Sequence, residues 1–251
     1  MKLIALDIET LTVNADEWIE SETIKQKAKL KSKLNANIEK IESKYKKLET
    51  IEKHSDDATD KYNTEVSGIS GILEKKLIGN RQFTQVICIG VAYQDNDYIA
   101  HQFFYDKEEK GVLHYFITWV NDLKRDYRFV TFNGDGFDLP QLIAAFSRCK
   151  MQLDSPLNSR QFIDLMKYPY ERFGGYSKLD DLAEVYGIEK PIGEQYKVTD
   201  FEDVDLDGSY VEEMFKLDQL DYQERVPAYC NQDTFKTLRI AQEVSRFIEV
   251  K

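Results

Sequence analysis

The chain has 251 residues, of which 42% are hydrophobic, and its formal net charge is -11 at pH 7. This length is near the upper limit for one hydrophobic core, so we expect a single domain over residues 1–251 with an insertion at 16–80. The negative charge argues mildly against a nucleic-acid partner, because affinity for phosphate comes mostly from Lys and Arg. It does not exclude a nuclease, since bound divalent cations reverse such a field locally.

The three cysteines, Cys88, Cys149 and Cys230, are widely spaced and lack any CxxC or Cys/His ligand spacing. They predict reduced thiols in an intracellular, cytoplasmic protein. The first apolar run, Leu3–Leu6, is too short for the core of a signal peptide, and no later run approaches membrane-spanning length. We therefore expect neither export nor a membrane partner.

Apolar runs and helical spacings predict an alternation of strands and helices along the rest of the chain. Strands are expected at 2–9, 85–93, 98–105, 129–132 and 162–165, and helices at 111–123, 139–149, 179–186 and about 226–247. Asp95-Asn96-Asp97 predicts the turn of an antiparallel hairpin, and Gly187 predicts a helix end. This order indicates an α/β fold with a mixed sheet covered by helices.

The segment between the first two strands has a different character. It contains no Gly or Pro from Asp16 to Lys61, and its apolar residues recur at spacings of three and four. This pattern predicts one amphipathic helix or a pair of helices inserted into the fold. The apolar positions are Leu30, Leu34, Ile38, Ile41, Tyr45 and Leu48.

Asp7 and Glu9 are the first candidates for chemistry. Two residues apart at the end of a buried strand, they project from the same face and form a rigid pair of oxygen ligands. An isolated Asp-x-Glu pair is more often a solvated strand end, so this pair is weak evidence by itself.

The Gly-rich segment from Asn133 to Pro140 follows a strand and opens a helix. Its glycines are expected to permit backbone angles that let a substrate approach closely. Asp138 is predicted either to cap the helix or to bind metal, and both roles are compatible. Asp135 is expected to serve the turn itself.

Tyr229 and Asp233 are expected near the start of the last helix. Their spacing of four residues puts both on one helical face, while Cys230 is expected to point elsewhere. By itself, such a pair is more often a half-buried Tyr beside a solvated Asp than part of an active site.

Together, Asp7, Glu9, Asp138 and Asp233 supply four carboxylates that only a bound cation holds together. Two unit charges ~4 Å apart repel by about 4 kcal/mol at an effective dielectric constant of 20. Oxygen ligands without His or Cys favour Mg²⁺ or Mn²⁺. Two such ions can support in-line displacement at phosphorus, so we predict phosphodiester hydrolysis.

Three ordered motifs resemble those of the DEDD exonucleases in their tyrosine-bearing branch. They are Asp7-Ile8-Glu9-Thr10, Asn133 through Asp138, and Tyr229-x-x-x-Asp233. The likeness is greatest to the proofreading domain of family B DNA polymerases and to the related free-standing predicted exonucleases. It extends to 176–183 and 207–211, and it covers most of the chain outside the insertion.

The resemblance implies a ribonuclease H-like sheet and a 3′-to-5′ exonuclease that acts on single-stranded DNA 3′ ends and releases nucleoside monophosphates. It implies that Asp7, Glu9, Asp138 and Asp233 bind two Mg²⁺ or Mn²⁺ ions and that Tyr229 contacts the attacking water. An unperturbed tyrosine is about 0.1% ionised at neutral pH, so we expect it to orient that water.

Substrate contacts are expected from Thr10, Asn133 and Phe137, with Asn133 near the scissile phosphate. The resemblance also suggests a role in DNA repair or replication. An exoribonuclease is the nearest alternative, because carboxylates that meet only phosphate do not register a 2′-hydroxyl. A ribonuclease H-like endonuclease would not require the tyrosine.

The insertion holds the main basic concentration of the chain. Thr23–Lys47 contains nine lysines and two glutamates, a net charge of +7, which leaves -18 for the remainder. The ordinary meaning of such a segment is a solvated helix. The alternatives are a clamp on the nucleic-acid backbone through Lys25, Lys29 and Lys33, or a recruitment surface for a protein partner or a second copy.

Overall fold

The computed structural model describes residues 2–13, 15–46, 48–77, 80–123, 127–152, 162–167, 178–188, 211 and 220–245. The chain divides into two compact units, Met1–Leu11 with Thr84–Lys251, and Thr12–Phe83. We call the first the α/β unit and the second the helical unit. Among the described helices, none is long and apolar enough to span a membrane.

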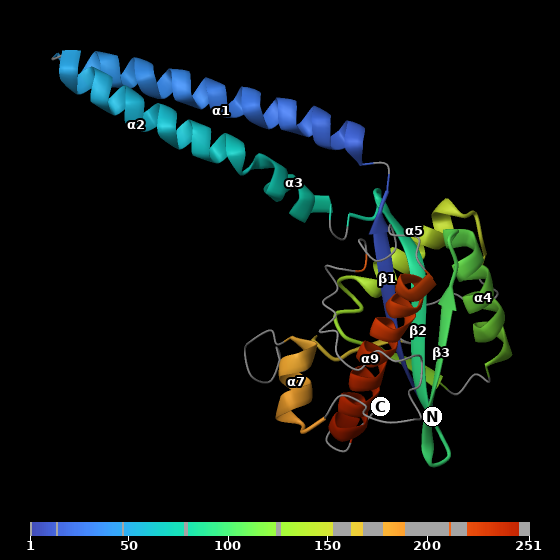
Figure 1. The fold of residues 1–251 in the computed structure, drawn as a ribbon. Coiled ribbons are helices and arrows are strands. Elements are labelled where there is room, and N and C mark those ends of the chain that lie inside the picture. Colours follow the sequence, from blue (N-terminus) through green and yellow to red (C-terminus); the bar gives the residue numbers. More distant parts are fainter. Residues whose placement is uncertain are drawn as a thin grey trace. The chain divides into compact units, whose positions relative to one another are not determined.

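A five-stranded mixed sheet forms the centre of the α/β unit, with strand order β3-β2-β1-β4-β5 (Figure 1). β2 pairs antiparallel with β3, whereas β4 runs parallel to both β1 and β5. The strands are β1 (Lys2–Thr12), β2 (Thr84–Asp95), β3 (Tyr98–Tyr105), β4 (Tyr127–Thr131) and β5 (Phe162–Asp164). The predicted hairpin is confirmed, and Asn96 makes its turn with a φ of 53°.

The helices of the α/β unit follow the predicted order. They are α4 (Glu109–Asp122), α5 (Asp138–Arg148), α7 (Leu179–Val185) and α9 (Leu220–Ser245). Gly187 follows α7 with a φ of 63°, as expected for a glycine that ends a helix. The prediction of an α/β fold with a mixed sheet flanked by helices, and with helices inserted between the first two strands, is confirmed.

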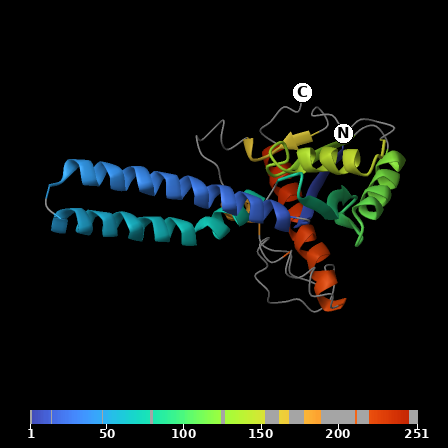
Figure 2. The same ribbon diagram turned by 90° about the horizontal axis from the view of Figure 1, so that it is seen from above.

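Alternation along β1 sorts its side chains between the two faces of the sheet. Ile4, Leu6 and Ile8 enter the core cluster that contains residues of α4 and α5. Ala5 packs instead with Leu238 of α9. Figures 1 and 2 show α9 crossing one face of the sheet, with α4 and α5 on the other. Asp7 and Glu9, in the same alternation as Ala5, therefore belong to the face that α9 covers.

The start of the last helix was predicted too late. α9 begins at Leu220 and continues through Pro227, so Tyr229 lies well inside the helix. Proline is favoured in the first turn and costly in a helix interior, yet this helix continues for seven residues before Pro227.

The helical unit contains two long helices and one short helix. They are α1 (Asp16–Lys44), α2 (Leu48–Ser67) and α3 (Ile69–Leu77). α1 and α2 run side by side as a hairpin, with the Tyr45 and His54 rings stacked 4.7 Å apart near its turn (Figures 1 and 2). Of the two forms considered, a pair of helices is therefore correct for 16–67. Leu48 does not continue the α1 stripe, because it begins α2 and is 71% exposed.

Candidate metal centre

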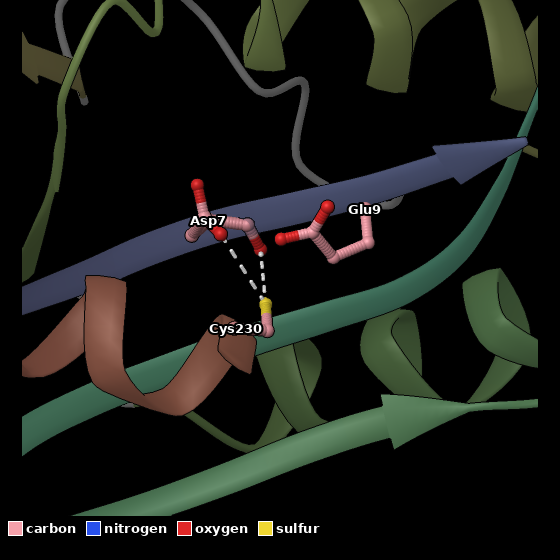
Figure 3. Close-up of side chains that lie close together, drawn as sticks. All are labelled: Asp7, Glu9 and Cys230. Atoms are coloured by element: carbon pink, nitrogen blue, oxygen red, sulfur yellow. Dashed lines mark hydrogen bonds between the residues drawn. The ribbon is translucent and has the colours of Figure 1, made fainter. Parts of the chain in front are cut away.

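β1 presents Asp7 and Glu9 toward α9. Figure 3 shows both carboxyl groups beside the Cys230 thiol, and one ligand atom from each of the three residues lies within 4.8 Å of the others. The carboxyl groups of Glu9 and Asp7 are neighbours, and the charge of Asp7 acts on Glu9. Burial and the neighbouring negative charges raise the pKa of both residues well above their usual values. Without a cation, these two carboxyl groups therefore lose their protons at a higher pH than ordinary carboxyl groups do.

Asp138 is the first residue of α5 and is only 2% exposed. It does not cap the helix: Phe137 occupies the cap position, and no side-chain capping bond is formed. The backbone N–H groups of Asp138 itself and of Ile8 on β1 act to lower its pKa, while Oδ1 has no hydrogen-bond partner among the residues that the structure describes. Burial raises its pKa to about 7. A buried oxygen of this kind is a candidate ligand atom for a cation.

Tyr229 and Asp233 complete the cluster from α9. Tyr229 and Asp233 are close enough that each affects the pKa of the other. Burial, followed by the charges of Asp233, Glu9 and Asp7, raises the pKa of Tyr229 above its usual value. The charges of Asp138 and Asp233 both raise the pKa of Asp7. The four carboxylates therefore lie close enough to interact electrostatically, in one site. The structure therefore brings together the five residues predicted from three separate segments.

Cys230 was expected to point away from this group, and that expectation is wrong. Its thiol donates to the Asp7 carboxylate at 3.4 Å and to the Asp7 backbone carbonyl at 3.5 Å (Figure 3). A Cβ added to Gly90 on β2 would lie 2.6 Å from Cys230 Sγ. The missing side chain at Gly90 thus lets α9 approach the sheet closely enough to present its two site residues to β1.

Sequence reasoning missed a buried cation, Lys236, one turn after Asp233. Its ammonium group lies 3.0 Å from Oδ1 of Asp233 and 2.6 Å from Oδ1 of Asp180 on α7. Lys236 opposes the effect of burial, which raises the pKa of Asp233. The sequence does show a lysine three residues after a candidate ligand. Whether that lysine turns toward the ligand depends on the position of α7, which the sequence does not give.

The Gly-rich turn is organised by Asp164, which sequence reasoning also missed. Its carboxylate accepts the backbone N–H groups of Asn133 at 2.9 Å and Asp135 at 3.2 Å. Asp135 also forms an ion pair with Lys167. These contacts fix the loop that leads into Asp138.

The expected role of the two glycines in this turn needs correction. Neither has a positive φ; the left-handed residue is Asn133, with a φ of 66°. A Cβ at Gly134 would lie 1.9 Å from the Thr131 hydroxyl oxygen, and one at Gly136 would lie 2.4 Å from the Asn133 side-chain oxygen. Gly134 is therefore required by its packing against the buried Thr131, whereas at Gly136 the exposed side chain of Asn133 can move aside.

The predicted substrate contacts differ in their surroundings. Asn133 is exposed beside the turn, whereas Phe137 is half-buried and packs against the main core. Thr10 is half-buried and belongs to the opposite alternation of β1 from Asp7 and Glu9. Lys25, Lys29 and Lys33 are exposed on α1, in the helical unit. Of the two further segments of resemblance, 176–177 and 207–210 lie outside the described residues.

The donor set fits divalent cations. Four carboxylates lie close together, burial raises their pKa values, and no described lysine or arginine is among the main influences on the pKa of three of them. Oxygen ligands of this kind suit Mg²⁺ and Mn²⁺. Cys230 adds a thiol at the edge of the set, but burial raises its pKa well above its usual value, which disfavours the thiolate that binds metal.

A family model described as the RNase_H superfamily matches residues 74–245. The match spans more than half of the chain and includes Asp138, Tyr229 and Asp233, whereas Asp7 and Glu9 precede it. A search of curated proteins finds no match to this chain.

Proposed function

This chain belongs to the RNase_H superfamily, and we propose that it is a metal-dependent 3′-to-5′ exonuclease of the tyrosine-bearing DEDD type. Membership supports a nuclease that uses divalent metal ions. The finer proposal rests on one observation: Tyr229 and Asp233, a helical turn apart, meet the carboxylates of β1 and α5 in one cluster. We further propose single-stranded DNA as the substrate and nucleoside monophosphates as the products.

In the proposed mechanism, Asp7, Glu9, Asp138 and Asp233 hold two Mg²⁺ or Mn²⁺ ions. When bound, these ions acidify a water molecule and stabilise the attacking and leaving oxygens of the phosphodiester. Each carboxylate must first give up any proton it shares, so metal binding releases protons. Oδ1 of Asp138, which has no hydrogen-bond partner among the described residues, would be available to hold such an ion.

Tyr229 acts in this mechanism as a neutral hydroxyl. Its raised pKa keeps the phenol protonated at neutral pH, which excludes phenolate as the resting base. The influence of Asp233, Glu9 and Asp7 on the pKa of Tyr229 places its hydroxyl beside the cluster. Tyr229 can therefore orient the attacking water without serving as its base.

The direct test uses 5′-labelled single-stranded DNA and RNA incubated with Mg²⁺, Mn²⁺ or EDTA. We expect a ladder that shortens from the 3′ end with either metal and intact substrate in EDTA. Cleavage of RNA alone would replace the proposal with the exoribonuclease alternative. No cleavage with either metal would instead favour a binding or recruitment protein that acts through the helical unit.

A second part of the proposal concerns a basic face of α1. Lysines recur there within about 100° of helical arc and span about 28 Å, at about 1.5 Å per residue. The segment 23–38 contains no acidic residue. All five lysines are exposed, and Lys25 alone pairs with an acidic neighbour, Glu22, at 3.5 Å within the described part of the chain. This lysine stripe comprises Lys25, Lys29, Lys33, Lys40 and Lys44.

We propose that the lysine stripe binds the nucleic-acid backbone, so that the helical unit supplies affinity and the α/β unit supplies chemistry. Single-strand binding depends on salt with a slope of about -0.7 for each phosphate neutralised. Replacing Lys25, Lys29 and Lys33 by Gln should therefore reduce the magnitude of the slope by about 2. An equal effect from a matched variant, K27Q/K31Q/K46Q, would show that general charge is responsible.

The insertion alternatively serves a protein partner or a second copy of the chain, and that possibility stays a prediction. Unchanged salt dependence in the triple variant, together with concentration-dependent self-association, would favour it. The intracellular, reducing location expected from Cys88, Cys149 and Cys230, which are free thiols here, also stays a prediction.

A further inference from the structure

Lys236 is a lysine that faces the interior of the α/β unit. Its side chain is 8% exposed, and its ammonium group lies between two carboxylates. A buried charge of this kind is costly unless it is paired and hydrogen-bonded, and both pairing groups are present here. One of them, Asp233, is a ligand in the proposed metal centre. The other, Asp180, is 75% exposed and has no other assigned task.

We propose that Lys236 is a positioning residue of the metal centre, which fixes the Asp233 carboxylate and withholds its Oδ1 from the metal. This inference rests on the proposed function for the identity of the site. The 3.0 Å contact occupies Oδ1 of Asp233, which leaves Oδ2 as the oxygen that is available to a metal ion. Asp233 then enters the site as a ligand through one oxygen with a defined rotamer.

Asp180 holds the ammonium group from the opposite side. It lies on α7, whose Leu182 and Ala183 pack with Ile240 and Ala241 of α9 in a separate core cluster. That packing sets the distance between the two helices, so the 2.6 Å contact from Asp180 to Lys236 is held by the fold. The chain of contacts therefore runs from the α7–α9 packing, through Lys236, to a metal ligand.

The lysine also sets the charge of the site. Four carboxylates within one cluster repel each other, and Lys236 offsets one of them. The same positive charge repels an arriving cation, so it should weaken metal binding while it maintains the geometry that turnover needs. A residue that merely filled space would produce no such opposition between affinity and rate.

The test compares Lys236→Met, Lys236→Arg and Asp180→Asn with wild type. Mn²⁺ affinity is measured from the free-ion signal in electron paramagnetic resonance, and kcat and KM are measured at saturating Mn²⁺. The matched control is Arg239→Met, because Arg239 is an exposed cation on the same helix that bonds to Gln242 at 3.1 Å.

For K236M we expect Mn²⁺ binding that is at least about threefold tighter, since a nearby positive charge is removed. We expect kcat to fall at least about tenfold with KM nearly unchanged, because a ligand loses its orientation. K236R should restore most of kcat, D180N should give a smaller loss, and R239M should match wild type.

Weaker Mn²⁺ binding by K236M would refute the proposal that Lys236 withholds Oδ1 of Asp233 from the metal. Affinity and kcat both within about twofold of wild type would refute positioning altogether. D180N keeps the test decisive if K236M does not fold, since it changes an exposed side chain. The Mn²⁺ measurement needs no substrate. It therefore still tests the effect of Lys236 on metal affinity if the protein cleaves no nucleic acid.

Discussion

Replacing Asp138 with Asn should stabilise the metal-free protein while it abolishes nuclease activity. Asp138 is 2% exposed, and within the described part of the chain Oδ1 of its carboxylate has no hydrogen-bond partner. The asparagine oxygen can still accept the Ile8 backbone N–H, and its amide nitrogen can donate toward the neighbouring carboxylates. The substitution therefore removes a buried charge and supplies a donor in the same space.

The magnitude follows from the pKa of Asp138, which burial raises from the usual 3.8 to about 7. One pKa unit corresponds to about 1.36 kcal/mol, so ionising this carboxyl costs the folded state about 4 kcal/mol. The contribution is fully favourable below the unfolded pKa, near 4, and is lost as pH rises through the folded pKa, near 7. Metal-free wild type should thus lose about 4 kcal/mol from this group between pH 4 and pH 7.

The assay is urea unfolding in EDTA at pH 5 and pH 8, with the free energy of unfolding extrapolated to water. At pH 8, D138N should exceed wild type by up to about 4 kcal/mol, and its pH dependence should be flatter. Saturating Mn²⁺ should stabilise wild type much more than D138N. Asp97→Asn, in the exposed β2–β3 turn, is the control. Lower stability of D138N in EDTA at pH 8 would refute the reasoning.

Three further predictions address the packing and the division of labour in the site. Gly90→Ala should destabilise the fold by about 1–3 kcal/mol through the 2.6 Å clash with Cys230 Sγ, and adding Cys230→Ala should restore stability in thermal melts. Tyr229→Phe should slow turnover by about a hundredfold, whereas Asp7→Ala or Asp233→Ala should leave almost none; equal, complete loss in all three would contradict a water-orienting tyrosine. Filter-binding titrations at several salt concentrations should give the lysine-stripe triple variant a shallower salt slope than its matched control.

The candidate ligands were accessible from sequence because each belongs to a short, local pattern. The two-residue spacing of Asp7 and Glu9 defines a strand face, and the four-residue spacing of Tyr229 and Asp233 defines a helix face. Such spacings do not depend on how elements pack. The hairpin turn at Asn96 was predictable for the same reason, since it lies within four consecutive residues.

The errors arose where tertiary packing overrides local preference. The last helix was expected to begin at about Val226, but it begins at Leu220 and passes through Pro227. The glycines of the 133–138 turn were expected to adopt unusual backbone angles, whereas the contact with Thr131 is what requires Gly134. Neither outcome can be derived from spacing, because each depends on neighbours that the local pattern does not contain.

Sequence alone therefore determined the α/β order of elements, the inserted helices and the identity of the carboxylates, because periodicity and residue chemistry are local properties. Only the tertiary structure decided which groups surround those carboxylates. Cys230 reaches Asp7 because Gly90 lets α9 approach the sheet, and Lys236 reaches Asp180 because α7 packs on α9. Contacts of this kind join residues tens to hundreds of positions apart, and close packing of the folded chain creates them.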